Sequence, residues 1–181
     1  NQSIGDIFHF NLFFLLFVKK RSSTSIQKGI AFGITSGVIT TLGLMVGLDA
    51  GTGSSLAVIV GIFAVAISDA FSDALGMHNA EEVDRRNSPR TLRKTTLATF
   101  FSKCFFTLTF AVPVFLFDLQ MAILVSIAWG LFVIGSFSYV VAHISKQRPE
   151  KIVFQHVLLT VIVIIITYYV GKLVGYLGSF L

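Results

Sequence analysis

The stretch LAVIVGIFAVAISDAFSDALGM, residues 56–77, reads as a membrane-spanning helix that carries two carboxylates. Its apolar length matches the roughly 20 residues that a helix needs to cross the hydrocarbon core. Asp69 and Asp73 are four residues apart, so they lie on one face of the helix. A carboxylate in hydrocarbon costs about 2.5–3.5 kcal/mol on insertion scales. This face is therefore expected to meet water, a cation, a basic partner or protons.

The chain as a whole is also strongly apolar. It has 181 residues, of which 54% are hydrophobic and 13% charged, whereas a soluble domain carries roughly 25% charged residues. We therefore expect an all-α integral membrane protein with five transmembrane helices. Pro113 predicts a kink in the third of them, and the single cysteine excludes an internal disulfide. The expected spans are 29–48, 55–78, 95–117, 120–142 and 152–176.

A shorter apolar run, residues 7–18, precedes these spans and is followed by Lys19, Lys20 and Arg21. It is too short to span comfortably, and it predicts an amphipathic helix lying in the membrane interface. A buried structural helix is the alternative. Basic residues after the run are the reverse of a signal peptide's charge order, so we expect no cleavable signal. The chain thus divides into an interfacial and basic segment, 1–28, and a five-span domain, 29–181.

Basic residues occur only in alternate connections between the spans. They precede the first span, separate the second from the third, and separate the fourth from the fifth, whereas the other two connections carry Asp49 and Asp118. The positive-inside rule then predicts a multi-pass protein with a cytoplasmic N-terminus and an external C-terminus. This topology explains the net charge of +5 without a nucleic-acid partner.

The second span is expected to continue as one helix to a turn at 87–89, where Pro89 follows Asn87 and Ser88. Steps of three and four residues then place five side chains on one stripe. Carboxylate oxygens suit divalent cations and a thioether adds softness, and a graded row of weak sites is what cation transport needs. The predicted metal ligands are Asp69, Asp73, Met77, Glu81 and Asp84. For Glu81, Glu82 and Asp84, a solvated helix face beside Arg85 and Arg86 is the alternative.

Lys103, in the third span, offers a second explanation of the aspartates. A hairpin that turns near Pro89 places Lys103 at the level of Asp73 in the antiparallel neighbour. A buried Asp73–Lys103 pair would lower the cost of burial without any transport. Such a pair would leave Asp69 unexplained, but it could also act as a gate that releases an aspartate when a cation arrives.

The first span adds a polar face, on which Ser36, Thr40 and Met45 are candidate path-lining residues. Hydroxyls in membrane helices more often bond their own backbone carbonyls. Small residues recur at spacings of four, as in Gly33 and Gly37, and they predict close helix contacts. These contacts could lie inside one bundle or at a dimer seam.

Three segments carry a resemblance to a known family: GITSGVITTLGLMVGL (33–48), AFSDALGMHNAEE (70–82) and ITYYVGKLVG (166–175). They resemble the vacuolar iron transporter and iron–manganese transporter family, nearest its short prokaryotic members. The resemblance implies a homodimer in a prokaryotic cell membrane that moves Fe²⁺ or Mn²⁺ out of the cytosol in exchange for protons. It places the path between the first and second spans. The family's first-span acid falls at Ser36 and its second-span methionine at Asp73, so the acidic function would have moved to the second span.

The first hypothesis is therefore a divalent-cation transporter in which Asp69 and Asp73 bind the cation, while Met77, Glu81 and Asp84 supply it. The metal is substrate, and no permanently bound cofactor is expected. Proton exchange follows if burial favours the protonated form of an aspartate. The second hypothesis is a non-transporting scaffold or partner-binding subunit with a structural Asp73–Lys103 pair. No nucleophile–base arrangement or phosphate loop suggests an enzyme.

Overall fold

The computed structural model describes residues 24–83 and 87–180. The predicted interfacial helix at 7–18 and the predicted ligand Asp84 lie outside these ranges. The described residues form helices and no strand. Five helical stretches are long and apolar enough to cross a membrane, with α4 and α5 counted together. The helices are α2 (Thr24–Thr52), α3 (Ser55–Glu82), α4 (Pro89–Thr109), α5 (Ala111–Leu116), α6 (Leu119–Ile144) and α7 (Pro149–Gly178).

The five expected spans are thus confirmed as helices, and the predicted turn at 87–89 is confirmed between α3 and α4. Most helix ends lie beyond the predicted spans, although α3 begins at the predicted residue and α5 ends one residue early. Side-chain caps fix several of the starts. The hydroxyl of Ser88 accepts a hydrogen bond from the backbone N–H of Thr91, and Pro89 occupies the first turn of α4. Asp118 caps α6 in the same way. The predicted boundary at 28/29 falls inside α2, which begins at Thr24.

The predicted kink in the third span is a break between α4 and α5 at Phe110. Pro113 has no N–H to donate to the carbonyl of Thr109, four residues earlier. At the break, the backbone N–H of Phe110 donates to the carbonyl of Thr107, three residues earlier, where an α-helix would use the carbonyl four residues earlier. The side chain of Thr109 also accepts a hydrogen bond from the indole of Trp129 on α6 at 3.2 Å.

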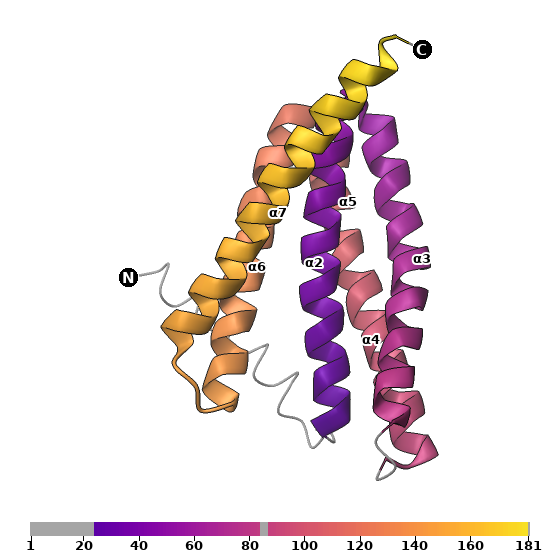
Figure 1. The fold of residues 1–181 in the computed structure, drawn as a ribbon, viewed down its shortest axis with the longest axis vertical. Coiled ribbons are helices and arrows are strands. Elements are labelled where there is room, and N and C mark those ends of the chain that lie inside the picture. The colour runs from indigo at the N-terminus through magenta and orange to yellow at the C-terminus, as the bar shows by residue number, and fades with distance from the viewer. Residues whose placement is uncertain (1–23, 84–86, 181) are drawn as a thin grey trace.

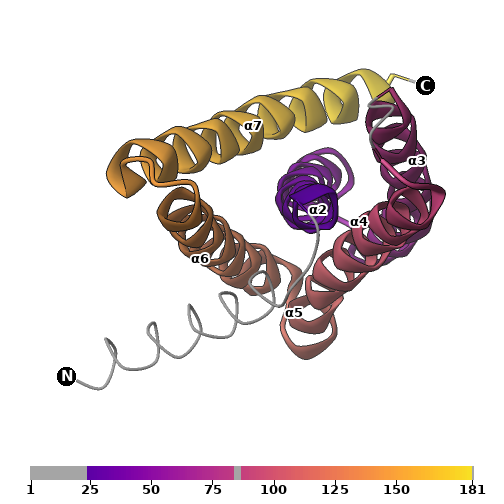
Figure 2. The same cartoon turned by 90° about the horizontal axis from the view of Figure 1, so that it is seen from below.

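Helix α2 lies at the centre of the bundle, with the other helices around it, as the view along its axis shows (Figure 2). In the side view α3 and α4 run beside α2, and α7 crosses it obliquely (Figure 1). The core is built on the buried face of α2, including Ile34, Val38 and Leu42, which are fully buried. One end of the bundle holds the start of α2, the α3–α4 turn and the α6–α7 connection. We call it the basic end, because Lys28, Arg90, Arg93, Lys94, Lys146, Arg148 and Lys151 belong to these segments.

Small residues bring α4 against α2. A Cβ atom added at Gly29 would lie 2.7 Å from the carbonyl of Thr95, and one added at Gly33 would lie 2.6 Å from the carbonyl of Thr99. Both distances are well inside van der Waals contact, so only glycine permits this approach. The α2–α4 interface is therefore a row of glycines facing backbone and hydroxyl groups of α4.

A second row of glycines packs α2 against α7. A Cβ atom at Gly51 would lie 3.0 Å from the carbonyl of Gly171, and one at Gly175 would lie 2.6 Å from the carbonyl of Gly51. The small-residue faces of α2 and α7 are thus used inside one chain. Of the two readings left open by the sequence, packing within the bundle accounts for these faces.

Candidate functional site

Lys103 is fully buried, and its ammonium group lies between two carboxylates. Its Nζ atom is 2.5 Å from Oδ2 of Asp69 and also forms an ion pair with Oδ2 of Asp73. It donates a further hydrogen bond to the hydroxyl of Ser36 at 2.9 Å. We call Ser36, Asp69, Asp73 and Lys103 the aspartate–lysine cluster. It joins α2, α3 and α4 within the hydrophobic bundle.

Helix packing explains why the lysine reaches this position. The glycines of α2 hold α4 so close that a Cβ atom at Gly37 would lie 3.1 Å from the backbone carbonyl of Lys103. The Lys103 side chain therefore leaves the backbone inside the bundle, and its ammonium can be paired only by groups that lie there. Asp69 and Asp73 lie on successive turns of α3, so their carboxylates flank one ammonium group. Burial of the charge is tolerated because it is paired and hydrogen-bonded.

The cluster carries more negative than positive charge. Two carboxylates face one ammonium, which leaves one unit of negative charge if all three groups are ionised. The hydroxyl of Ser36 donates to Asp73 at 2.7 Å and adds a dipole but no charge. Burial differs within the cluster: the side chain of Lys103 is 0% exposed, that of Asp73 18% and that of Asp69 33%. The excess charge therefore lies on the more accessible side, at Asp69.

The predicted pairing of Asp73 with Lys103 is confirmed. The expectation that this pair would leave Asp69 unexplained is wrong, because the same ammonium binds both carboxylates. Ser36 belongs to the cluster, whereas Thr40 donates to the backbone carbonyl of Ser36, as hydroxyls in membrane helices usually do. Met45 is fully buried in the hydrophobic core. It lies nine residues from Ser36, about 13 Å along α2, so it packs the core and does not line the cluster.

Glu81 belongs to a second polar network at the basic end. Its Oε1 accepts a hydrogen bond from the ammonium of Lys28 at 3.0 Å, and its Oε2 accepts one from the side-chain amide of Asn87 at 2.9 Å. Asn87 also donates to the backbone carbonyl of Glu81 and accepts from the hydroxyl of Ser25. Glu81 is 6% exposed, so the solvated-face alternative is wrong for it. The network ties the start of α2 to the end of α3 and to the α3–α4 turn.

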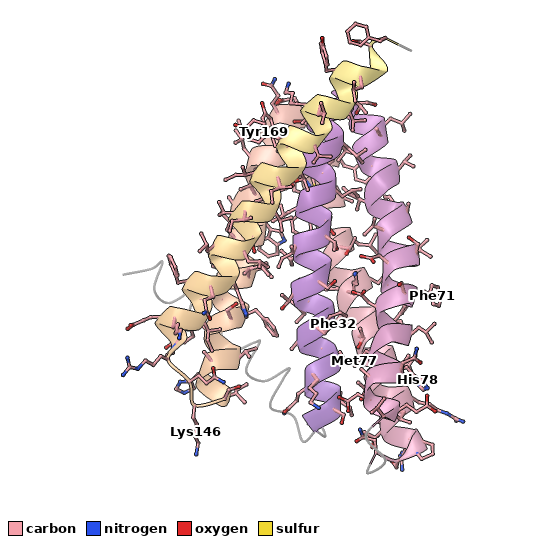
Figure 3. The ribbon with its side chains drawn as sticks, in the orientation of Figure 1. Phe32, Phe71, Met77, His78, Lys146 and Tyr169 are labelled. Carbon is pink, nitrogen blue, oxygen red and sulfur yellow. The ribbon has the colours of Figure 1, made fainter. Side chains whose placement is uncertain are left out.

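The two networks follow the same antiparallel pairing of α2 with α3. Lys28 precedes Ser36 by eight residues, and Glu81 follows Asp73 by eight residues. The same antiparallel register places Phe32 of α2 opposite Met77 of α3, midway between the networks. Figure 3 labels both side chains where the two helices run side by side. The predicted stripe on α3 is therefore divided: Asp69 and Asp73 bind Lys103, Glu81 binds Lys28 and Asn87, and Met77 lies between them.

Within residues 24–83 and 87–180, no group of three or more His, Cys, Asp or Glu side chains is arranged to hold a metal ion. The cluster offers two carboxylates and one hydroxyl, all oxygen donors of the kind that divalent cations prefer. The ammonium of Lys103 lies between the two carboxylates. The arrangement can therefore hold one cation, and in this structure that cation is the chain's own.

Sequence reasoning missed Lys28 and Asn87 as partners of Glu81. A signal was present: a turn near Gly53, where the backbone adopts a positive φ of 58°, sets the register of α2 against α3. With this register, the residue of α2 that lies opposite Glu81 is Lys28. The prediction considered only the register of α3 against α4, so it found Lys103 and not Lys28.

No protein-family model, curated protein or solved structure matches this chain.

Proposed function

We propose that this protein transports a divalent cation across a membrane, with Asp69 and Asp73 as the central binding site. The observation that carries the proposal is the composition of the aspartate–lysine cluster. Two carboxylates and a single ammonium sit inside a bundle of five helices long and apolar enough to span a membrane. Ionisable groups at such depth are costly, and they commonly mark an ion pathway.

Lys103 has a defined part in this proposal. Its ammonium fills the site when no substrate is bound, so the carboxylates are never left facing each other unneutralised. A divalent cation that enters from the exposed side at Asp69 competes with the ammonium for the same oxygens. Lys103 then withdraws toward α4, and it returns when the cation leaves. Binding stays weak enough for release, which conduction requires.

The orientation of the protein is proposed from its charge distribution, and the substrate from the family resemblance of its sequence. We place the basic end in the cytoplasm by the positive-inside rule. Iron or manganese as the substrate, exchange against protons, export from the cytosol, a homodimeric assembly and a prokaryotic cell membrane rest on the family resemblance of the sequence. They remain predictions.

Transport can be tested in proteoliposomes that contain a metal-sensitive dye. Mn²⁺ or Fe²⁺ added outside should quench the dye in vesicles with the wild-type protein, and the Asp69→Asn plus Asp73→Asn variant should lose this influx. Glu82→Gln is the matched control, because Glu82 is an exposed carboxylate of the same helix. Equal influx in wild type and the double variant would refute the mechanism.

A second function is favoured by one specific observation: the site is already filled by Lys103. A non-transporting scaffold would need only the structural role of this ion pair. The two functions differ in the response to Lys103→Gln combined with Asp73→Asn, which neutralises the pair but keeps Asp69. A scaffold should assemble with its partner as before and show no metal influx in any form. A transporter should show influx in the wild type and a changed metal dependence in this variant.

A further inference from the structure

The hydrogen-bonded network at the basic end has no place in the cation site, although it lies on the same two helices. Glu81 and Asp73 are two helical turns apart on α3, and Lys28 and Ser36 are two turns apart on α2. Each separation is about 12 Å along the helix. The two networks are therefore parallel links between α2 and α3, one above the other.

The link at the basic end is well satisfied. Both carboxylate oxygens of Glu81 accept hydrogen bonds, and the side chain of Asn87 makes three. A buried carboxylate that is paired in this way is costly to separate from its partners. Yet the ammonium of Lys28 is on a side chain that is 58% exposed, so this partner can leave into solvent. Lys28 can therefore leave without being buried elsewhere, whereas Glu81 is left with Asn87 as a side-chain donor until water reaches it.

Apolar side chains lie between the two links. The register places Phe32, which is 43% exposed, opposite Met77, which is half-buried. A phenyl ring and a thioether, which is only a weak acceptor, offer a hydrated ion little hydrogen bonding. On the opposite side of the cluster α2 borders a more open space. A groove of about 920 Å³ between α2 and α7 has Thr40 and Val65 in its lining, one turn beyond Ser36 and Asp69 respectively. The Glu81 network and the Phe32–Met77 pair thus lie on the basic-end side of the cluster, and the groove begins one helical turn away on the other side.

We propose that the contacts of Glu81 with Lys28 and with Asn87 form a latch that closes the basic end of the α2–α3 pair. Phe32 and Met77 form the apolar layer behind it. Opening of the latch would separate the ends of α2 and α3 and admit water from the basic end toward Asp73. A role of this latch in transport rests on the proposed function, but the opening itself can be measured without transport.

The test uses one reporter cysteine in the full-length protein, on a Cys104→Ser background. Met77→Cys lies one turn inward from Glu81 and reports water at the apolar layer. Reconstituted protein is treated with a charged, membrane-impermeant thiol reagent, and the rate of modification is measured. Leu75→Cys is the matched control, since Leu75 lies on the outer face of the same helix and is 60% exposed.

Breaking the latch with Lys28→Gln should raise the modification rate at Met77→Cys about tenfold, which corresponds to about 1.4 kcal/mol. The rate at Leu75→Cys should stay unchanged. Exchanging the two charges, Lys28→Glu with Glu81→Lys, should return the Met77→Cys rate toward that of the parent. Three results would overturn the proposal: no increase at Met77→Cys, an equal increase at both reporters, or no recovery in the exchanged pair. These outcomes do not depend on transport, so a protein that does not transport metal could still show the latch.

Discussion

The ammonium of Lys103 lies 2.5 Å from Oδ2 of Asp69, and the lysine side chain has no exposed surface. This relationship makes Lys103 the counter-ion of the whole acidic face of α3, since the same group also binds Asp73. The stability of the bundle and the availability of the site for another cation are therefore linked through one side chain.

Removal of the lysine charge should destabilise the protein strongly. Lys103→Met would leave two carboxylates in close proximity, and breaking a buried ion pair costs about 3–5 kcal/mol. The partial exposure of Asp69 favours the lower end of this range. Thermal unfolding in detergent, followed by the fluorescence of Trp129, the single tryptophan, measures the loss.

Two further variants control this experiment. Lys172→Met removes an exposed lysine whose ammonium lies over the ring of Tyr168, and it should cost about 0.5–1 kcal/mol. Adding Asp69→Asn and Asp73→Asn to Lys103→Met should recover most of the lost stability, because no unpaired charge remains. If the triple variant unfolds as early as Lys103→Met alone, charge balance is not what holds the cluster together.

The two aspartates should not be equivalent. Asp73 is more buried than Asp69 and accepts hydrogen bonds from both Lys103 and Ser36. Hydrogen bonds to charged groups contribute about 1.5–3 kcal/mol each. Asp73→Asn should therefore lower the unfolding temperature more than Asp69→Asn does. The same fluorescence assay ranks the pair, and the reverse order would contradict the described geometry.

Asp73 and Glu81 differ in how well the sequence predicts their partners. The pairing of Asp73 with Lys103 was predictable, because Pro89 fixes the turn and the turn fixes the depth of each residue on α3 and α4. The second bond, to Asp69, was not predictable from depth alone, since it depends on how a long side chain enters between two helices. Glu81 was predicted as a ligand, with a solvated helix face as the alternative, and neither prediction named Lys28, because Lys28 lies on α2, which is distant in sequence.

The helices themselves were predictable, since apolar length determines them. The partners of the glycine rows were not. A four-residue spacing of small residues predicts a close contact but does not name the opposing helix. The structure shows that α2 uses one row against α4 and another against α7.

The glycine row against α4 should be intolerant of even one methyl group. In Gly33→Ala the new Cβ would meet the backbone carbonyl of Thr99, which cannot rotate away. Overpacking of this kind costs about 1–3 kcal/mol, and the shift of α4 should also weaken the contact of Lys103 with the aspartates. Gly76→Ala is the control, because no atom lies within 4 Å of its Cβ position. There the gain in helix propensity should stabilise by about 1 kcal/mol. Equal effects of the two substitutions on the unfolding temperature would show that the α2–α4 distance is not set by Gly33.

The latch should be sensitive to a single charge placed on Asn87. Its amide donates to both the carboxylate and the backbone carbonyl of Glu81. Asn87→Asp replaces this donor by a carboxylate that repels Glu81. The loss of a charge-assisted hydrogen bond should cost about 1.5–3 kcal/mol. Asn79→Asp makes the same chemical change at an exposed position of α3 and should be nearly neutral. Because position 87 is only half-buried, part of the repulsion at Asn87→Asp should be screened by salt. The unfolding temperature of this variant should therefore rise more between low and high ionic strength than that of Asn79→Asp. A salt response of the same size in both variants would mean that the carboxylate at position 87 does not act on Glu81.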